Sequence, residues 1–426
     1  MQPTPTDPVT PTAPLLPPSA LRIDGERLQR RIRELAAIGA IPGGGCCRLA
    51  LTDADKAGRD LVVGWMKALD LEVTIDRIGN VVARERWRPE LAPVVTGSHI
   101  DTVRTGGQLD GNFGVLAGLE VIEALRGAGV RPARPLAVAF FTNEEGARFA
   151  PDMMGSAVQQ GALDLEAALT TVGIDGARVG DELRRIGYAG DAPCHLDAHA
   201  FVELHIEQGP VLDREGITIG AVTGVQGISW TEVSLRGVSN HAGTTPIALR
   251  HDAGLVAAEI AVFLRRLALE LDAPQVATVG ALTLRPNLVN VVPNHALLTL
   301  DLRNTDEAIL QEAERRAFAF VDEAAAREGV QAERRTLARF APVAFDPRVI
   351  ARVEAAALAL GHSVRRMPSG AGHDAQMFAP RCPTAMLFVP SVDGISHNVA
   401  ERTEAKDLEA GANVLLQVLL GLADEG

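Results

Sequence analysis

Apolar and polar positions along the chain predict helices separated by short buried strands. Residues 56–70 and 112–129 repeat apolar side chains every three to four positions, as helices do. Residues 92–98 and 134–146 contain continuous apolar runs, and residues 71–84 have the pattern of a hairpin. Continuous apolar strands with helices between them indicate an α/β sheet that is covered on both faces.

Polar motifs of this region follow the apolar runs. The segments TGSHIDT, TNEEGAR and ELHIEQG each stand at the carboxyl end of a predicted strand. Binding sites of open α/β sheets gather beyond that end. Glu144 and Glu145 are adjacent acids, which are costly to bury together unless a cation or a proton compensates. A solvated turn is the simplest interpretation of the pair, but its place favours one acid that binds a cation and one that moves protons.

The pattern changes near residues 220–227. A strand, a helix, two strands, a helix and a strand are predicted in turn over residues 228–237, 249–271, 276–285, 295–304, 306–329 and 330–340. This β-α-β-β-α-β order is the split βαβ (ferredoxin-like) arrangement, an open sheet with helices on one face. The predicted division is a disordered tail (1–21), a catalytic domain (22–222), an inserted lid or dimerisation domain (223–342) and the rest of the catalytic domain (343–426).

Composition excludes several classes of partner. The 426 residues suffice for two or three domains, and the formal net charge is −13. This charge argues against nucleic acid or an anionic membrane, whereas an excess of carboxylates suits a protein that holds divalent cations. No uninterrupted apolar run reaches membrane-spanning length, so no membrane is expected as a partner.

The cysteines and the first residues indicate a cytoplasmic protein. Cys46 and Cys47 are adjacent, while Cys194 and Cys382 are isolated, so neither a zinc ribbon nor a disulfide framework is present. Reduced thiols in the cytoplasm explain them most simply. The first twenty residues are rich in Pro and Thr and lack the basic and apolar regions of a signal peptide.

Candidate metal ligands come from histidines beside acids. Five of the ten histidines stand in polar, glycine-flanked segments, namely His99, His205, His241, His373 and His397. Each alone is more often a hydrogen-bonded loop histidine. Together with Asp110 and the glutamate pair, they supply the nitrogen and oxygen ligands that zinc, manganese or cobalt prefer.

Simpler sites are rejected. His195 and His199 are four residues apart, but the Glu of a zincin helix is missing between them. The sequence contains no G-x-S-x-G, which argues against an α/β serine hydrolase. The glycines of PGGGCC are not followed by Lys and Ser or Thr, so nucleotide binding is unsupported.

The motifs together carry a resemblance to a known family. In chain order they are TGSHIDTV, GGQLDGNFGV, FTNEEGARF, LHIEQGPVL, SNHAGTTPIALRHDA, PNLVNVVP, DLRN, PSGAGHDAQMFA and GISHN. They resemble the di-metal amidohydrolases that include N-carbamoyl-L-amino-acid hydrolase and allantoate amidohydrolase, relatives of aminoacylase and carboxypeptidase G. The resemblance implies an α/β fold of two domains, a mixed-sheet di-metal peptidase-like catalytic domain with an inserted ferredoxin-like lid.

The resemblance also implies a metal site and a base. Asp110 is expected to bridge two divalent ions per subunit, with zinc as first choice and manganese, cobalt or nickel as alternatives. The other implied ligands are His99, Glu145, His205 and His397. Asp101 resembles the carboxylate that orients the ring of His99. Glu144 matches the general base, which takes a proton from the water that bridges the metals and delivers it to the leaving nitrogen.

Half of the implied substrate contacts lie in the inserted domain. Arg303 offers a planar, two-pronged partner for a carboxylate. Asn290 and Gln208 match polar contacts to the carboxylate and ureido groups, and the backbone of Gly370 and Ala371 matches further contacts, with His373 structural. His241 resembles a histidine that crosses a dimer interface to stabilise an oxyanion. A homodimer through the inserted domain is therefore expected, with domain closure bringing Arg303 to the metals.

Two substrates remain open. The first choice is hydrolysis of an N-carbamoyl-L-amino acid to the L-amino acid, carbon dioxide and ammonia. Allantoate is the alternative, because it also presents a carboxylate beside a ureido group. An N-acyl-amino acid hydrolase or peptidase is less expected, and a non-catalytic relative would have lost a ligand or the base, whereas every such position here holds a suitable residue.

Overall fold

A computed structural model of the chain describes residues 21–271 and 275–425. The described residues form two compact units. The first runs to Thr223 and resumes over Phe345–Met367 and from Gly372, and the second is Gly224–Ala344 with Pro368–Ala371. The tail expected over residues 1–21 lies, up to residue 20, outside the described residues.

The first unit is built on a nine-stranded mixed sheet in the order β13-β8-β15-β7-β5-β6-β4-β3, with β14 beside β8. Its helices and strands before the insertion are α1 (Gly25–Ala36), β1 (Ala40–Ile41), β2 (Gly45–Cys46), α2 (Asp53–Ala68), β3 (Glu72–Ile75), β4 (Val81–Arg84), β5 (Val94–His99), α3 (Asn112–Gly127), β6 (Leu136–Phe141), α4 (Met154–Gln159), α5 (Leu165–Thr170), α6 (Val179–Ile186), β7 (Ala200–Ile206), α7 (Val211–Glu215) and β8 (Ile219–Val225). The last residues of the insertion form β13 (Val343–Ala344), which pairs with β8, and after it come α10 (Pro347–Ala359), β14 (Val364–Ser369), α11 (Ala375–Phe378), β15 (Thr384–Val389), the 3-10 turn η2 (Val392–Gly394) and α12 (Ala405–Ala423).

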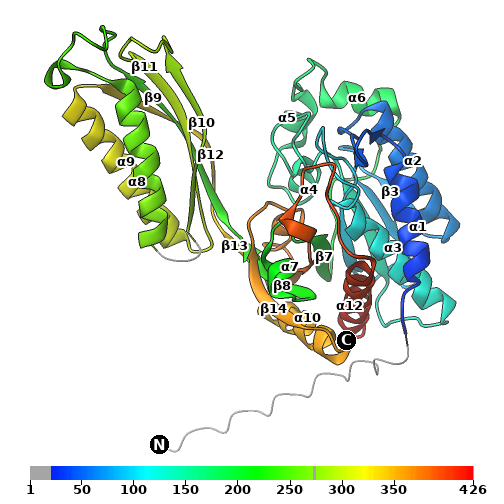
Figure 1. The fold of residues 1–426 in the computed structure, drawn as a ribbon. Helices are drawn as coiled ribbons and strands as arrows, with labels where there is room; N and C mark the ends of the chain where they lie inside the picture. Colours follow the sequence, from blue (N-terminus) through cyan, green and yellow to red (C-terminus); the bar gives the residue numbers. More distant parts are fainter. Residues whose placement is uncertain (1–20, 272–274, 426) are drawn as a thin grey trace, which may run out of the picture. The chain divides into compact units, whose positions relative to one another are not determined.

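Four parallel strands form the centre of this sheet. The strands β15, β7, β5 and β6 lie side by side and parallel, and every residue in them is buried. Side chains that point to either face of these strands are buried, so other elements must cover both faces of the sheet, as the continuous apolar runs predicted. Helices α1, α3 and α12 pack against one another beside the sheet (Figure 1). The carboxyl ends of all four strands therefore meet at one edge.

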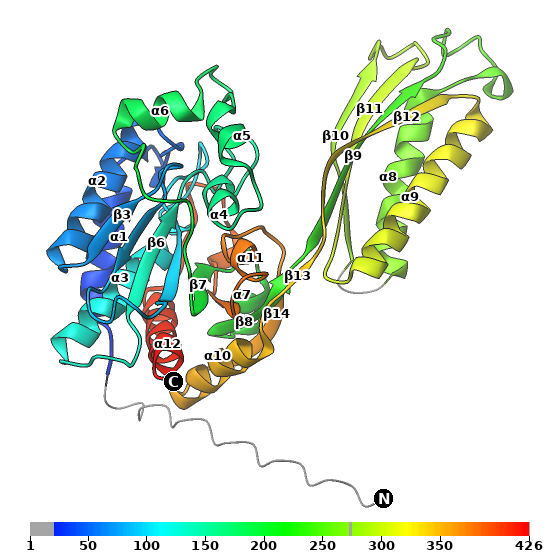
Figure 2. The same ribbon diagram turned by 180° about the vertical axis from the view of Figure 1, so that it is seen from behind.

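The second unit is the predicted split βαβ domain. It contains β9 (Gly227–Arg236), the 3-10 turn η1 (Ile247–Leu249), α8 (Ala253–Glu270), β10 (Val276–Arg285), β11 (His295–Asn304), α9 (Glu307–Glu328) and β12 (Gln331–Phe340). The sheet order is β10-β11-β9-β12, with antiparallel neighbours throughout. Helices α8 and α9 lie side by side on one face (Figure 2).

Strict alternation along β11 explains this one-sided cover. Ala296, Leu298, Leu300 and Leu302 are buried and belong to the core beneath α8 and α9. The residues between them, including Asp301 and Arg303, are half-buried and point to the other face. Below, this helix-free surface of β9 and β11 is called the open face.

The short segment Pro368–Ala371 joins the second unit, although the sequence division placed it in the catalytic domain. The backbone N–H of Gln226 donates to the carbonyl of Ser369 at 3.0 Å. Arg303 Nη1 donates to the carbonyl of Gly370 at 2.8 Å. Hydrogen bonds between segments far apart in sequence leave no local signal, so periodicity alone misses this attachment.

Within residues 21–271 and 275–425, no helix combines the length and the apolarity needed to cross a membrane.

Candidate active site

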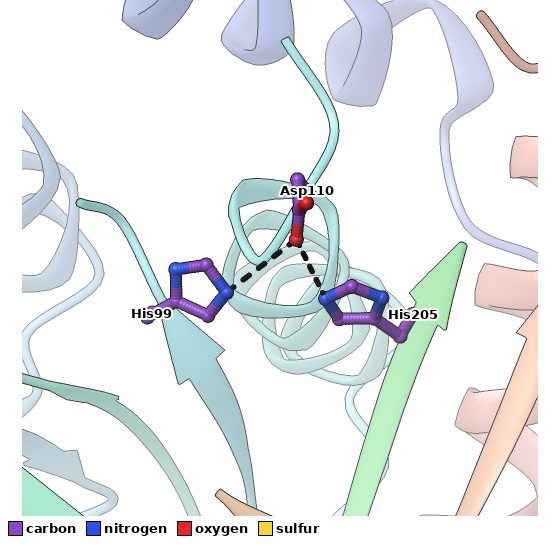
Figure 3. A group of neighbouring side chains, drawn as sticks. All are labelled: His99, Asp110 and His205. Carbon is purple, nitrogen blue, oxygen red and sulfur yellow. Dashed lines mark ion pairs between the residues drawn. The ribbon is translucent and has the colours of Figure 1, made fainter. Parts of the chain in front are cut away.

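The candidate site lies where the four parallel strands end. His99 is the last residue of β5, His205 stands near the end of β7, and Glu144 and Glu145 follow β6. His397 follows β15 and η2, and Asp110 precedes α3. His99 and His205 are thus strand residues rather than the loop residues that their polar surroundings indicated. Figure 3 shows both rings turned toward Asp110 from neighbouring strands.

Asp110 is shared by two groups of side chains. Its Oδ1 lies 3.6 Å from Nε2 of His99 and 3.2 Å from Nε2 of His205. Its Oδ2 lies 3.2 Å from Nε2 of His397, which is itself 3.4 Å from Oε2 of Glu145. Each group of three offers ligand atoms close enough to hold a metal ion. The arrangement therefore provides two groups of candidate metal ligands that share Asp110.

The buried histidines present the nitrogen that a metal needs. Nδ1 of His99 lies 2.9 Å from the carbonyl of Asp101, and Nδ1 of His205 lies 2.9 Å from the carbonyl of Ile206. A carbonyl can only accept, so Nδ1 carries a hydrogen in each ring, and Nε2, which faces Asp110, is the nitrogen that a cation would bind in place of a proton. Gly111 permits this approach: it adopts a φ of 64°, and a Cβ there would come within 2.4 Å of the His99 ring.

The carboxylates of the site are crowded. Burial, with the neighbouring charge of Asp110, raises the pKa of Glu145 to about 8. Burial likewise raises the pKa of Glu144 well above its ordinary value. Burial opposes the ionisation of Asp110, yet hydrogen bonds from the surrounding histidines hold its pKa well below the usual range. Such a cluster attracts positive charge, and cations suit the donor set of imidazole nitrogens and carboxylate oxygens.

Glu144 belongs to neither group. Its Oε2 lies 3.3 Å from Nε2 of His99, and the side chain is buried beside the cluster. Asn143, in the left-handed region at a φ of 57°, forms the turn that follows β6. This turn allows the two adjacent acids to face the same cluster, although neighbouring residues of a strand point to opposite sides.

Asp101 lies beside His99 and also contacts the turn that carries the two glutamates. Its carboxylate is 4.0 Å from Nδ1 of His99, farther than its own backbone carbonyl. The carboxylate oxygens instead accept the backbone N–H groups of Glu144 at 3.2 Å and Glu145 at 3.4 Å. Its side chain thus orients the glutamate turn, and its backbone orients the histidine.

Gln208 lies against the candidate metal ligands. Its Nε2 donates to Oδ2 of Asp110 at 2.9 Å, and its backbone adopts a φ of 58°. Its Oε1 is buried and has no hydrogen-bond partner among the described residues. An unpaired buried acceptor is costly, so this oxygen is available to an N–H of a bound molecule.

Other residues near the cluster were not singled out from the sequence. Arg48 is fully buried and joins two site segments, donating to the carbonyl of Ile100 at 2.7 Å and to Oδ1 of Asn112 at 2.7 Å. Glu401 and Ser396 lie on the other side of Asp110. Their local sequence looks like ordinary loop, and only the fold brings them to the site.

A third group contains His373, which was expected to be structural. Glu203, His205 and His373 lie within ligand distance of one another, all buried. The Glu203 carboxylate already accepts from Ser98 Oγ at 2.6 Å and from the N–H of Ala375 at 2.8 Å. This engagement favours a structural role. None of the three groups found among the described residues includes His195 or His199.

Arg303 is held on the open face of the second unit. Its Nε and Nη2 donate to Asp301, at 3.0 Å and 2.9 Å, and its Nη1 donates to the carbonyl of Gly370 at 2.8 Å. The guanidinium also lies over Trp230, 5.8 Å from the ring centroid. These contacts use three of the five N–H donors, so two stay available for an anion. The expected backbone contact Gly370 is thus adjacent to Arg303, with Ala371 next to it.

His241 and Asn290 lie at the opposite end of the same unit. The N–H of Ala242 donates to the carbonyl of Asn290 at 2.9 Å, so the two expected substrate residues are neighbours, and both are exposed. They stand beyond the end of β11 that begins at His295, whereas Arg303 is near its other end. Eight residues of strand span about 27 Å. One small substrate therefore cannot touch Arg303 and His241 of the same copy.

Known proteins resemble this chain over nearly its whole length. A family model described as peptidase family M20/M25/M40 matches residues 95–421. N-carbamoyl-L-amino-acid amidohydrolase of Rhizobium meliloti is 40% identical over 405 residues, 95% of this chain and 97% of the relative. Allantoate amidohydrolase of Escherichia coli (strain K12) is 37% identical over 406 residues, 93% of this chain and 98% of the relative. A solved hydantoinase/carbamoylase family amidase from Burkholderia multivorans is 47% identical, with a TM-score of 0.92 and coverage of 95% and 99%.

Proposed function

Because the chain belongs to peptidase family M20/M25/M40, we propose that it hydrolyses the ureido C–N bond of N-carbamoyl-L-amino acids. Each turnover consumes one water and yields the L-amino acid, carbon dioxide and ammonia. The observation that carries the proposal is Asp110, whose two oxygens face two separate groups of ligand residues. The carbamoylase relative, which is similar from end to end, supports the choice of substrate.

Two divalent cations per subunit complete the proposed site. His99, Asp110 and His205 would hold one, and Asp110, Glu145 and His397 would hold the other. Zinc fits this mixture of imidazole and carboxylate, and manganese, cobalt and nickel fit it as well. Cations bound there would supply Lewis-acid chemistry, which lowers the pKa of water and polarises a carbonyl.

Glu144 is the proposed general base. It takes a proton from the attacking water as the oxygen bonds to the ureido carbon, and it delivers that proton to the leaving nitrogen. Its buried position favours the task, because burial raises the pKa of its carboxyl and makes the ionised form a better proton acceptor. Gln208 Oε1 accepts an N–H of the ureido group.

Arg303 binds the substrate carboxylate through its two remaining donors. Asp301 already occupies the edge formed by Nε and Nη2, which fixes the plane of the guanidinium before substrate arrives. A guanidinium held this way loses little freedom when it binds an anion. The backbone of Gly370 and Ala371 lines the same position.

His241 and Asn290 act on the site of a second copy of the chain. Their distance from Arg303 supports this arrangement, since both ends of the unit are needed for one substrate. His241 stabilises the oxyanion that forms when water attacks, and Asn290 contacts the substrate beside it. The active unit is therefore a homodimer.

The surface of the second unit supports a homodimer. Leu255, Val262 and Leu269 are exposed at seven-residue spacing on one stripe of α8. Strand β10 is an edge strand packed beside α8, and Val276 and Leu282 on it are exposed. An apolar stripe next to a free strand edge is costly in water, and a second copy covers both at once.

A second candidate substrate is allantoate, which the relative from Escherichia coli favours. The carboxylate and the ureido group are the same, so every residue role above is unchanged. We place the reaction in the cytoplasm, which the four free cysteines support.

The test compares ammonia release from N-carbamoyl-L-methionine and allantoate by metal-loaded protein, with a chelator-treated control. Preference for the first, lost on chelation, is the expected result. Preference for allantoate would transfer the catalytic assignments to the second candidate. Absence of ammonia release from both substrates, measured with a metal-loaded dimer, would overturn the proposal.

A further inference from the structure

Glu401, which belongs to none of the motifs quoted above, accepts hydrogen bonds from the backbone of the segment that carries Asp110. Oε1 of Glu401 accepts two consecutive backbone N–H groups, that of Leu109 at 3.0 Å and that of Asp110 at 3.2 Å. Its Oε2 accepts the hydroxyl of Ser396 at 3.0 Å, and this hydroxyl also lies 3.3 Å from Oδ2 of Asp110. Glu401 therefore contacts the backbone of Asp110 directly and the carboxylate of Asp110 through the hydroxyl of Ser396.

Packing beside the segment is incomplete where a pocket adjoins it. A cavity of about 460 Å³ lies behind it, lined by Gln29 and Arg33 of α1 and by Leu109 and Glu401 themselves. Without Glu401, the two N–H groups would be buried without an acceptor, which costs free energy whenever Asp110 keeps its position.

The Glu401 carboxylate occupies the space that a side chain at position 107 would need, and this position is a glycine. A Cβ on Gly107 would come within 2.2 Å of Oε1 of Glu401 and within 2.3 Å of its carboxyl carbon. No side chain fits at that position while Glu401 holds the segment. Glu401 also follows His397 by four residues, and its own N–H donates to the carbonyl of Asn398 at 3.0 Å. It thus links the Asp110 segment with the segment of a second proposed ligand.

We propose that Glu401 is a positioning residue, which sets the bridging carboxylate of Asp110 by accepting the N–H groups of Leu109 and Asp110. The inference rests on the proposed metal site. The acceptor geometry, rather than the negative charge, is the property that matters. Outer groups that orient a metal ligand typically change metal affinity by about 10- to 100-fold when removed.

Two conservative variants separate geometry from charge. Glu401→Gln keeps the length and an acceptor oxygen but removes the charge, whereas Glu401→Asp keeps the charge but is one methylene too short to reach both N–H groups. Mn²⁺ binding to metal-free protein is measured by electron paramagnetic resonance of the free ion. We expect Glu401→Asp to weaken at least one Mn²⁺ equivalent about tenfold or more, and Glu401→Gln to stay within about threefold of wild type.

Three results decide the matter. Wild-type affinity in Glu401→Asp, or stronger Mn²⁺ binding in Glu401→Asp than in Glu401→Gln, would overturn the positioning role. Failure of the wild-type protein to bind Mn²⁺ or Zn²⁺ would overturn the metal site itself. Glu404→Gln is the matched control, since this exposed glutamate of the same segment pairs only with Arg402 among the described ion pairs.

Gly107→Ala provides an independent route if a Glu401 variant does not fold. The added methyl group pushes the Glu401 carboxylate away without altering any charge or ligand. We expect the same loss of Mn²⁺ affinity, accompanied by a lower kcat with KM little changed. Unchanged Mn²⁺ affinity in folded Gly107→Ala protein would contradict the proposal.

Discussion

The two units differ in how they arrange their proposed functional residues. In the first unit the proposed ligands His99, Asp110 and His205 are buried, and each ligand atom is already aimed by a second hydrogen bond or a neighbouring strand. In the second unit the proposed substrate residues are split between the two ends of one sheet, and His241 and Asn290 are exposed. The proposed metal ligands are thus brought together within one chain, whereas we propose that a second copy completes the substrate site.

The contrast follows from the sheets that carry the residues. Parallel strands end at one edge, so four strand ends bring their side chains together without further devices. An antiparallel sheet sends successive strand ends to opposite edges, so its terminal residues are separated by the length of a strand. Preassembly suits highly charged metal ligands, and separation suits a site that must open and close around its substrate.

The largest effect is expected for Glu144, the proposed general base beside the candidate metal ligands of the first unit. Glu144→Gln removes the proton acceptor without touching either ligand group, so kcat falls by about 10²- to 10⁴-fold. Metal content, measured by elemental analysis, stays at the wild-type value. A Gln variant that keeps its activity would show that Glu144 is not the base.

The second largest effect is expected for His241, which we propose acts on the active site of a second copy of the chain. His241→Ala removes the oxyanion donor and lowers kcat by about 10²- to 10³-fold. Mixing it with the inactive Glu144→Gln variant restores activity, because each mixed dimer contains one intact site. Random exchange gives about a quarter of wild-type activity. If His241 served its own chain, the mixture would stay inactive.

Arg303 tests the other end of the second unit. Arg303→Leu removes a charged hydrogen-bonding partner of the substrate carboxylate, so kcat/KM falls by about 10- to 100-fold, mostly through KM. Arg327→Leu, which removes a surface arginine of α9 paired with Glu259, is the control and is expected to leave kcat/KM unchanged. An Arg303 variant with unchanged KM would remove Arg303 from the substrate site.

The smallest effect concerns how Arg303 is held. Asp301→Asn weakens the contact with Nε and Nη2, a half-exposed pair worth less than about 1 kcal/mol. KM for the substrate then rises by no more than about fivefold, while kcat stays constant. A larger loss than that of Arg303→Leu would mean that Asp301 itself touches the substrate.

The sequence predicted much of this molecule because its signals are local. Periodicity indicates the β-α-β-β-α-β order and the buried parallel strands, and the quoted motifs identify the family, which the comparisons confirm. Motif order likewise identifies His99, Asp110, Glu145, His205 and His397, which the structure brings into two groups sharing Asp110.

The supporting residues could not be predicted because their partners are far away in the chain. Glu401 reaches Asp110 across 291 positions, and Arg48 reaches Asn112 across 64. Neither stands in a motif that signals metal chemistry. The separation of Arg303 from His241 also required the strand register, since both belong to motifs that the sequence alone treats as parts of one site.

The central claim is that Asp110 bridges two cations, and the metal content per subunit tests it most directly. Elemental analysis of protein dialysed against trace metal is expected to give two ions per subunit for the wild type, one for Glu145→Ala and none for Asp110→Ala. Circular dichroism confirms that the variants are folded. One ion in the wild type, or two retained in folded Glu145→Ala, would contradict the account.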